Sequence, residues 1–311
     1  MRVLFWGTPE FAVPPLRALA GEGHEVVGVV TQPDRAAGRS RSTLVASPVK
    51  AVALEEGIPV LQPERPRGED FLAAARALEP EISVVVAYGH ILRQEVIDLP
   101  ARGTVNIHAS LLPALRGAAP IQAAIRLGLG ETGVSIVRMV LALDAGPVLF
   151  QQRTPILPDE TFGELALRLS ELGALAIVQS LALVEVGAAT EAPQDESLAT
   201  WAPKIDRTTT RIDWSSSAFE ISQMIRAFDP KPGAWTTLRG ADVKLFGGGV
   251  DVESREGAPG EVLAVLADGA IVACGNGAVR VTTLQPAGKK RLAAAELARG
   301  RGIAVGDRLG G

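Results

Sequence analysis

Residues 3–31 read VLFWGTPEFAVPPLRALAGEGHEVVGVVT, a pattern that predicts a strand, a helix and a second strand. The runs Val3–Trp6 and Val26–Thr31 are short and mostly apolar, as strands buried on both faces of a sheet are. Gly7 ends the first run, and a helical segment separates the two runs. This order is typical of a βαβ unit, which places both strands in one parallel sheet.

The same alternation continues through the first 155 residues. Further strands are expected at Ile58–Leu61, Ile82–Ala87, Thr104–Ile107 and Val134–Met139. Ser47 followed by Pro48 predicts the start of a helix that ends at Gly57. Acidic residues suited to the start of a later helix are Asp159, Glu160 and Glu164. We therefore predict an α/β, Rossmann-like first domain with a mostly parallel sheet, whose ligands bind beyond the carboxyl ends of the strands.

After residue 205 the pattern changes to short strands separated by glycine-containing turns. The expected strands are Val243–Phe246, Glu261–Leu266, Ile271–Cys274 and Val279–Leu284. The sequences ADG at 267–269 and GNG at 275–277 are typical of hairpin turns. Short strands joined by tight turns predict a small β-barrel, similar to an OB fold, rather than a continuation of the parallel sheet.

The length of 311 residues is about twice that of a domain of roughly 150 residues, which favours two domains. The polar stretch 185–200 is the expected linker region. We predict domains at 1–187 and 206–311, joined by a linker at 188–205.

Composition excludes several classes of protein. A hydrophobic share of 47% and a charged share of 21% are those of a folded, soluble chain rather than a disordered or coiled-coil one. The single cysteine, Cys274, cannot form an internal disulfide. Three scattered histidines with one cysteine do not provide a structural zinc site of about four ligands, and no metal is expected.

Neither a membrane span nor a targeting segment is expected. The longest apolar stretch, Leu172–Leu183, is interrupted by polar residues and is shorter than the ~18 apolar residues of a membrane helix. The N-terminus has no basic leader before its short apolar run, so we expect a cytoplasmic protein.

The net charge of −4 hides an asymmetry along the chain. Residues 1–205 hold 17 Lys and Arg against 23 Asp and Glu, whereas residues 206–311 hold 14 against 12. The relatively basic second part is compatible with a nucleic-acid partner, and also with an ordinary surface composition.

A dinucleotide site is not expected after the first strand. Gly7-Thr8-Pro9 is a glycine turn between a strand and a helix, but the two further glycines of a GxGxxG fingerprint are missing. Phe11–Val13 occupy the positions where the backbone would have to approach the phosphates closely.

The stretch 105–121, VNIHASLLPALRGAAPI, carries the strongest chemical signal. Asn106 and His108 are two positions apart in a predicted strand, so their side chains lie on the same face near the strand end. An Asn amide can stabilise an oxyanion and a His can move protons near neutral pH, which together suit acyl transfer to an amine. The alternative is a histidine with a structural role at the end of a strand.

Asp144 follows the next predicted strand, in the sequence Leu143-Asp144-Ala145-Gly146. If the two strands are neighbours, its carboxylate reaches the edge where Asn106 and His108 lie. The alternative is an aspartate that only caps its own turn.

Arginines gather in the segment Asp34–Leu44, which lacks core-facing periodicity. Arg35, Arg39 and Arg41 suit phosphate binding because a guanidinium donates two hydrogen bonds in a planar fork. The alternative is a solvated loop with incidental charge. In the second domain a basic run follows the turn at Gly288, and its members are Lys289, Lys290 and Arg291.

The chain resembles the 10-formyltetrahydrofolate-dependent formyltransferase superfamily. The resemblance is carried by three stretches, NIHASLLP at 106–113, RGAAPI at 116–121 and LDAG at 143–146. The resemblance extends over essentially the whole chain, through GTPEFAVP at 7–14, TQPDR at 31–35, SPVK at 47–50, APKI at 202–205, RAFDP at 226–230 and LQPAGKK at 284–290. It departs from the common pattern at Ala114, Leu115 and Ala145.

The resemblance implies that Asn106, His108 and Asp144 are the catalytic positions. It further implies a folate site lined by Ser110, Leu111, Leu112 and Pro113. It also implies a barrel-like second domain that helps to hold tRNA. It implies, in addition, an RNA-contacting loop in which Arg39 matches an important basic position.

The resemblance is strongest to members that formylate the α-amino group of initiator methionyl-tRNA for translation initiation. We also expect the protein to be a monomer. Alternatives are a sugar-nucleotide or purine-pathway formyltransferase, a formyl-folate hydrolase, and a noncatalytic RNA-binding module. A purine-pathway enzyme would not need the ~100 residues after 205, and a hydrolase would belong to a longer chain.

Overall fold

The computed structural model describes residues 1–37, 43–253 and 255–311, and it divides into two compact units. The first unit comprises residues 1–117, 132–154 and 166–201. The second comprises residues 118–131, 155–165 and 202–311.

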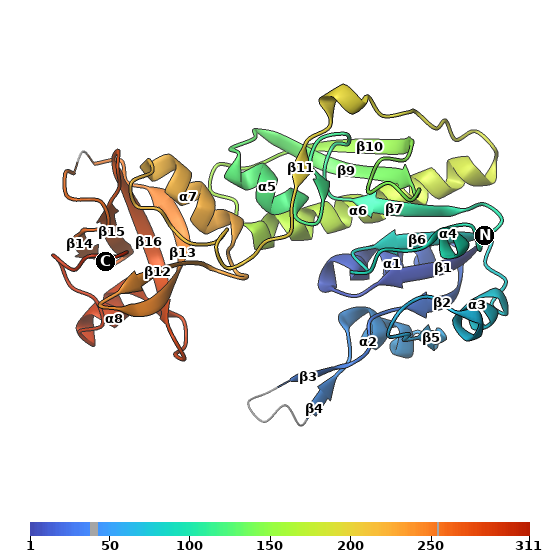
Figure 1. Ribbon diagram of the computed structural model, residues 1–311, viewed down its shortest axis with the longest axis horizontal. Helices are drawn as coiled ribbons and strands as arrows, with labels where there is room; N and C mark the ends of the chain where they lie inside the picture. Colours follow the sequence, from blue (N-terminus) through green and yellow to red (C-terminus); the bar gives the residue numbers. More distant parts are fainter. Residues whose placement is uncertain (38–42, 254) are drawn as a thin grey trace. The chain divides into compact units, whose positions relative to one another are not determined.

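A seven-stranded sheet forms the centre of the first unit, in the order β10-β9-β7-β6-β1-β2-β5 (Figure 1). Its strands are β1 (Arg2–Gly7), β2 (Glu25–Val30), β5 (Val60–Leu61), β6 (Ile82–Val86), β7 (Thr104–His108), β9 (Glu131–Arg138) and β10 (Val148–Pro155). Strands β5, β2, β1, β6 and β7 are mutually parallel, and β9 pairs with β7 in the antiparallel sense. The mostly parallel sheet is therefore confirmed.

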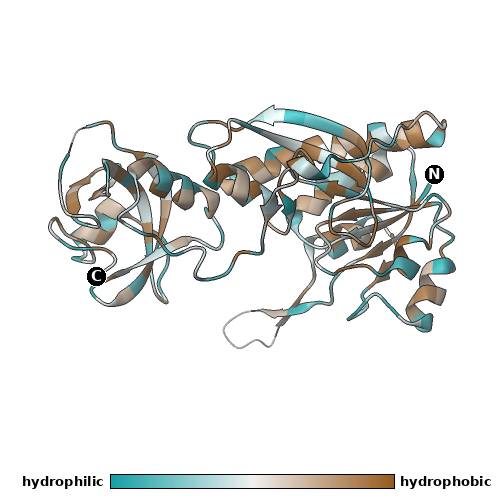
Figure 2. Cartoon of the chain, turned by 45° about the horizontal axis from the view of Figure 1, so that its top comes forward, coloured by the Kyte–Doolittle hydropathy of each residue, from teal (hydrophilic) through white to brown (hydrophobic). Residues whose placement is uncertain are grey.

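Helices follow the strands, as the alternating pattern predicts. They are the 3₁₀ helix η1 (Glu10–Ala12), α1 (Val13–Gly21), α2 (Pro48–Glu55), α3 (Glu69–Arg76), α4 (Gln94–Ile97) and α6 (Phe162–Glu185). The expected cap of α2 is present, because the backbone N–H of Lys50 donates to Ser47 Oγ at 3.1 Å. Figure 2 shows the sheet of this unit largely in the colour of hydrophobic residues, in keeping with strands buried on both faces.

One close contact explains why polar residues of β7 can serve a site. Val105 and Ile107 of β7 are buried, and a Cβ placed on Gly173 of α6 would lie only 3.0 Å from Ile107 Cγ2. α6 therefore packs closely on the face of β7 that carries Ile107. Because side chains alternate along a strand, Asn106 and His108 lie on the other face.

α6 is also long and apolar enough to cross a membrane, judged by length and composition alone, and it is the one such helix in the described part of the chain. Half of its most apolar window is buried within the protein, as in the core helices of many soluble proteins. The expectation based on Leu172–Leu183 underestimated this helix, which begins ten residues earlier.

A two-stranded antiparallel arm extends from the first unit (Figure 1). It consists of β3 (Arg35–Ala37) and β4 (Thr43–Val45), so part of the segment predicted as a loop is a ribbon. The carboxylate of Asp34 at its base pairs with Lys50 Nζ at 2.7 Å and accepts from Gln62 Nε2 at 2.7 Å. These two hydrogen bonds hold the pKa of Asp34 below its ordinary value.

The second unit contains an antiparallel sheet in the order β12-β13-β16-β15-β14, with β17 added beside β16. The strands are β12 (Ala234–Leu238), β13 (Ala241–Val250), β14 (Val262–Leu266), β15 (Gly269–Ala273), β16 (Ala278–Pro286) and β17 (Leu292–Ala293). Its helices are α5 (Pro120–Arg126), α7 (Ala218–Ala227) and α8 (Ala294–Arg299). The predicted antiparallel strands and both predicted hairpins are confirmed.

Residues near the end of the chain connect the two edge strands of this sheet. Leu309 forms a bridge to Leu238 at the end of β12, and Arg308 forms one to Glu261 beside β14. These two bridges link the edge strands of the sheet through the end of the chain, as in a small barrel. The barrel interior is an apolar cluster that includes Trp214, Ile225 and Phe228. Burial of each such large side chain contributes about 1.5–3 kcal/mol.

Candidate active site

The end of β7 carries two of the predicted catalytic residues. In register, Asn106 lies opposite Val137 and His108 opposite Ser135 of β9. The imidazole of His108 is 5% exposed, so the protein surrounds it almost completely. The expected adjacency of β7 and β9 is thus present, but the pairing is antiparallel, so the connection that follows β9 begins beside Thr104 at the start of β7. Asp144 reaches His108 from within that connection.

Two groups contact the His108 ring. The Nε2 atom lies 3.0 Å from the carbonyl oxygen of Leu115, and because a carbonyl can only accept, Nε2 is the donor. The Nδ1 atom lies 3.7 Å from Oδ2 of Asp144. This arrangement leaves Nδ1 free to take a proton, and the carboxylate stands where it would stabilise the resulting imidazolium.

Asp144 is held in a specific position between β9 and β10. Its backbone has a φ of 52°, in the left-handed region, and its Oδ2 accepts from the backbone N–H of Gly117 at 2.9 Å. Gly146 allows the turn to close, since a Cβ there would lie 1.8 Å from the carbonyl oxygen of Arg138. The carboxylate therefore faces His108 and the 116–117 backbone rather than capping its own turn.

Asn106 differs from its two neighbours because its side chain is half-buried and makes no hydrogen bond with any residue that the structure describes. A polar amide at a sheet edge without a protein partner is available to a ligand. An amide N–H is also the type of donor that stabilises a developing oxyanion.

The predicted folate-site residues form a tight loop after β7. Ser110 Oγ donates to the carbonyl oxygen of Ala114 at 2.6 Å, and both Ser110 and Leu112 are nearly fully buried. Leu111 and Pro113 are partly exposed. Ser110 and Leu112 thus shape the loop, whereas Leu111 and Pro113 have surface available for contact.

Two residues that the sequence did not single out hold this loop in place. Ser135 of β9 accepts from the backbone N–H of Leu112 at 3.0 Å and donates to the carbonyl oxygen of Ser110 at 2.7 Å. Gln151 Nε2 of β10 donates to the carbonyl oxygen of Leu112 at 2.8 Å. A polar residue inside an apolar strand, as Ser135 is in Val134–Met139, was the available signal.

The predicted basic residues of the first unit fall into two groups. Arg35 lies exposed on β3 of the arm. Arg39 and Arg41 lie outside the described residues.

The predicted basic run of the second unit is divided by its contacts. Lys289 and Lys290 are exposed, and neither takes part in an ion pair among the described residues. Arg291 instead binds both carboxylate oxygens of Asp229, at 3.0 and 3.1 Å, and its guanidinium lies 3.9 Å from the ring centroid of Phe246. Asp229 is 6% exposed, so Arg291 neutralises a buried charge.

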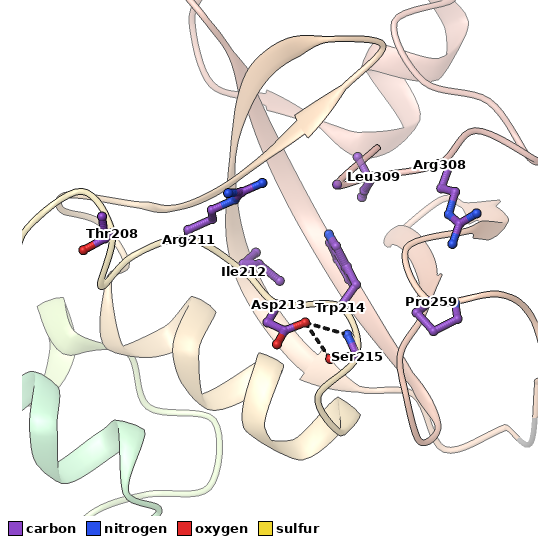
Figure 3. A pocket seen from close by; sticks show the side chains of 10 residues that line it. Thr208, Arg211, Ile212, Asp213, Trp214, Ser215, Pro259, Arg308 and Leu309 are labelled. Carbon is purple, nitrogen blue, oxygen red and sulfur yellow. Dashed lines mark hydrogen bonds between the residues drawn. The ribbon is translucent and has the colours of Figure 1, made fainter.

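A cavity of about 490 Å³ adjoins the closure of the barrel. Figure 3 shows Arg211 and Arg308 on either side of Trp214, with Asp213 accepting hydrogen bonds from Ser215. None of the ion pairs among the described residues involves Arg211 or Arg308, and the Arg211 guanidinium lies over the ring of Trp235, 5.6 Å from its centroid.

As a whole, the β7 edge combines an unpartnered amide, an imidazole with one free nitrogen, and a carboxylate beside it. These groups can stabilise an oxyanion and move a proton. Within the described part of the chain, no group of three or more His, Cys, Asp or Glu side chains is placed to hold a metal ion.

Comparison with known proteins gives matches over nearly the full chain. The family model described as formyl transferase matches residues 1–181, and the model described as formyl transferase, C-terminal domain, matches residues 204–302. A methionyl-tRNA formyltransferase of Pseudomonas putida is 47% identical over 312 residues, covering 100% of both chains. One of Moorella thermoacetica is 45% identical over 310 residues, covering 100% of this chain and 99% of the relative.

Among solved structures, HypX of Aquifex aeolicus in complex with tetrahydrofolic acid superimposes with a TM-score of 0.70 at 22% identity. The match covers 96% of this chain and 46% of HypX, so the chain spans about half of that protein. At this identity the likeness concerns the fold.

Proposed function

This chain belongs to the formyl transferase family, and from that premise we propose that it formylates the α-amino group of methionine on initiator methionyl-tRNA. The formyl donor is 10-formyltetrahydrofolate, and the product serves translation initiation. The observation that carries formyl transfer is the placement of His108 and Asp144 beside the unpartnered amide of Asn106. The choice of methionyl-tRNA as acceptor is supported by the full-length relatives that bear that name.

In the reaction, the neutral methionyl amine attacks the formyl carbon of the donor. A carbon–nitrogen bond forms, and the carbonyl oxygen gains negative charge. The amide of Asn106 donates a hydrogen bond to that oxygen, which lowers the energy of the tetrahedral intermediate.

His108 moves the protons. Its Nδ1 atom takes a proton from the attacking amine, while its Nε2 hydrogen stays bound to the carbonyl of Leu115. The proton then passes to N10 of the folate as the carbon–N10 bond breaks. Asp144 stabilises the imidazolium between these two steps.

We assign donor binding to the loop that contains Ser110, Leu111, Leu112 and Pro113. Its backbone is fixed by Ser135 and Gln151, so it offers a preorganised surface beside the catalytic groups. Residues 1–187 form the catalytic domain in this proposal and residues 206–311 the tRNA-binding domain, and residues 188–205 connect the two, with the part up to Trp201 lying in the first unit.

For tRNA we assign Arg35 of β3 together with Arg39 and Arg41, and the C-terminal residues Lys289, Lys290 and Arg291. Exposed Lys and Arg side chains bind the phosphate backbone by charge. Arg291 has the weakest case of this set, because its guanidinium already binds Asp229. Arg211 and Arg308, which line the cavity of the second unit, add positive charge there.

We further infer a monomeric, cytoplasmic protein that uses neither a metal nor a membrane. The tRNA substrate is a cytoplasmic component, and the burial of half of α6 within the protein favours a core role for that helix.

A parallel assay tests the proposal. The protein is offered labelled 10-formyltetrahydrofolate with methionyl initiator tRNA, methionyl elongator tRNA, free methionine or an amino-sugar nucleotide. We expect the label to appear mainly on the methionyl initiator tRNA. Label on the sugar nucleotide alone would favour a sugar formyltransferase. Release of free formate would favour a hydrolase. Binding of tRNA without formyl transfer would favour a noncatalytic RNA-binding module.

Arg39→Ala gives the matching test of the assigned tRNA contacts. Use of methionyl-tRNA should weaken, whereas donor binding should stay unchanged, because a phosphate contact contributes to RNA affinity and not to a separate folate pocket.

A further inference from the structure

The segment Gln194–Thr200, predicted as part of a linker, is bound to both loops that carry the catalytic groups. It contains the 3₁₀ helix η2 (Glu196–Leu198) and leads into β11 (Trp201–Ala202). We call Gln194–Thr200 the strap. Its hydrogen-bond partners outside the strap lie within the first unit, and three of its side chains and the backbone of Thr200 make these contacts. The Thr200 N–H donates to the carbonyl oxygen of Pro113 at 3.3 Å, and the Thr200 carbonyl accepts from the Arg116 N–H at 2.9 Å.

Gln194 holds the loop of Asp144. Its Nε2 atom donates to the backbone carbonyl oxygens of Asp144 and Gly146, both at 2.7 Å. Its Oε1 atom accepts from Nε and Nη2 of Arg116, at 3.1 and 2.8 Å. One side chain thus joins the Asp144 turn to the chain that follows the folate loop.

Thr200 holds the residue that orients His108. Its Oγ1 atom accepts from the backbone N–H of Leu115 at 2.9 Å, and the carbonyl oxygen of Leu115 accepts from His108 Nε2. Leu115 has a φ of 59°, a left-handed conformation that L residues rarely adopt, so it needs support from its surroundings. Thr200 supplies part of that support.

Arg116 fastens the strap itself. Its side chain is 2% exposed, and its guanidinium binds both carboxylate oxygens of Glu196 at 2.8 Å. This pairing raises the pKa of Arg116 and lowers that of Glu196. Because an unpaired guanidinium is costly to bury, the ion pair ties the strap to the catalytic loop.

We propose that the strap is a positioning element of the active site, with Gln194 and Thr200 as positioning residues for Asp144 and His108. Gln194 fixes the carboxylate side of the imidazole, and Thr200 fixes the carbonyl on its other side. This inference rests on the proposed function, since it assigns the strap to the same catalytic groups.

The test uses side chains of matched shape. Thr200→Val removes the Oγ1 acceptor at constant shape, whereas Thr200→Ser keeps it. Gln194→Glu keeps an acceptor for Arg116 but removes the N–H donor to the Asp144 and Gly146 carbonyls. Ser197→Ala is the control on the strap, because the Ser197 hydroxyl contacts only Asp195.

We expect Thr200→Val and Gln194→Glu to lower kcat by about 10–10²-fold, the size of effect that a small misplacement of catalytic groups produces. KM for donor and for tRNA should change little, because neither residue contacts a substrate in this proposal. Thr200→Ser should restore most of kcat, and Ser197→Ala should retain it.

A second measurement does not depend on activity. In protein with isotope-labelled histidine, the His108 ring signals should shift in Thr200→Val and Gln194→Glu and stay in place in Ser197→Ala. Wild-type kcat and unshifted His108 signals in both variants would overturn the strap proposal. So would a loss in Thr200→Ser as large as in Thr200→Val. Absence of formyl transfer by the wild type would instead contradict the proposed function, and the ring signals would still test the strap.

Discussion

Nδ1 of His108, the last residue of β7, lies 3.7 Å from Oδ2 of Asp144, which is in the connection between β9 and β10. The separation is longer than a hydrogen bond, but it is short enough for strong electrostatic stabilisation in a buried site. His108 donates on its other side to Leu115, so the ring is fixed before any substrate arrives. The site is therefore preorganised for a proton to be taken at Nδ1.

His108→Ala should lower kcat by at least ~10²-fold, because the variant lacks the group that moves protons. Asn106→Ala should lose a similar factor, since it removes the oxyanion donor. Initial rates at saturating donor and methionyl-tRNA give the measurement.

Both variants should fold, and Asn106→Ala in particular removes no hydrogen bond within the described chain. Circular dichroism and thermal unfolding provide that control. Turnover close to the wild-type rate in either variant, at proven saturation, would remove that residue from the catalytic set.

Asp144→Asn separates charge from structure. An Asn side chain can still accept from the Gly117 N–H, which Asp144 does at 2.9 Å, but it carries no charge to stabilise the imidazolium. We expect kcat to fall by more than about 10-fold with little change in the unfolding midpoint. An unchanged kcat would show that the carboxylate acts only as a structural acceptor.

Local patterns predicted most of the elements of the first unit. Periodicity and flanking glycines identified β1, β2, β6, β7 and β9, because buried parallel strands are continuous apolar runs. β10 was missed, since its apolar start is followed by four consecutive polar residues, QQRT at 151–154.

The sequence could not predict contacts between distant segments. It placed Asn106 and His108 on one face, but the hydrogen bonds of Gln194 and Thr200 join segments about 50 and 85 positions apart. The polar composition of residues 188–205 also predicted a linker. Exposed residues are of the same types whether a segment is bound along a domain, as the strap is, or only connects two domains. The barrel closure by Arg308 and Leu309 depends in the same way on tertiary pairing.

The donor site should recognise folate and not a nicotinamide dinucleotide. A Cβ on Gly7 would lie 2.7 Å from Ala12 Cβ, so the first turn packs tightly against its own helix and offers no glycine-rich phosphate cradle. Reduced folate carrying a formyl group should raise the unfolding temperature and compete with its product. Saturable NAD or NADP binding that competes with folate would contradict this assignment.

Cys274 should resist thiol reagents in the folded protein. Burial raises the pKa of its thiol to about 12, so only about 1 in 10⁴ thiols is ionised near pH 8. The folded state disfavours the thiolate, so stability should fall as the pH rises from about 9 toward 12. Tyr88, whose pKa burial raises to about 12, acts in the same direction above about pH 10. Rapid labelling of Cys274 under native conditions would refute its buried, neutral state.

The basic run of the second unit should divide into RNA-binding and structural residues. Lys289→Ala combined with Lys290→Ala should flatten the salt dependence of tRNA binding, by about 0.7–0.9 in log–log slope for each phosphate interaction that the substitutions remove. Protein stability should be unchanged, because both side chains are exposed and unpaired in the described chain.

Arg291→Ala should behave differently, because it leaves the carboxylate of Asp229 buried with only the backbone N–H of Gly247 as a described partner. We expect a loss of about 1–3 kcal/mol in the free energy of unfolding, since Arg291 is itself partly exposed and its pair is not fully desolvated. Denaturant titration measures this loss, and tRNA titration over a range of salt concentrations measures the slope. If Arg291→Ala flattened the slope without destabilising the protein, Arg291 would be a phosphate-binding residue after all. If the double lysine variant left both slope and kinetics unchanged, the turn after Gly288 would be an ordinary solvated surface.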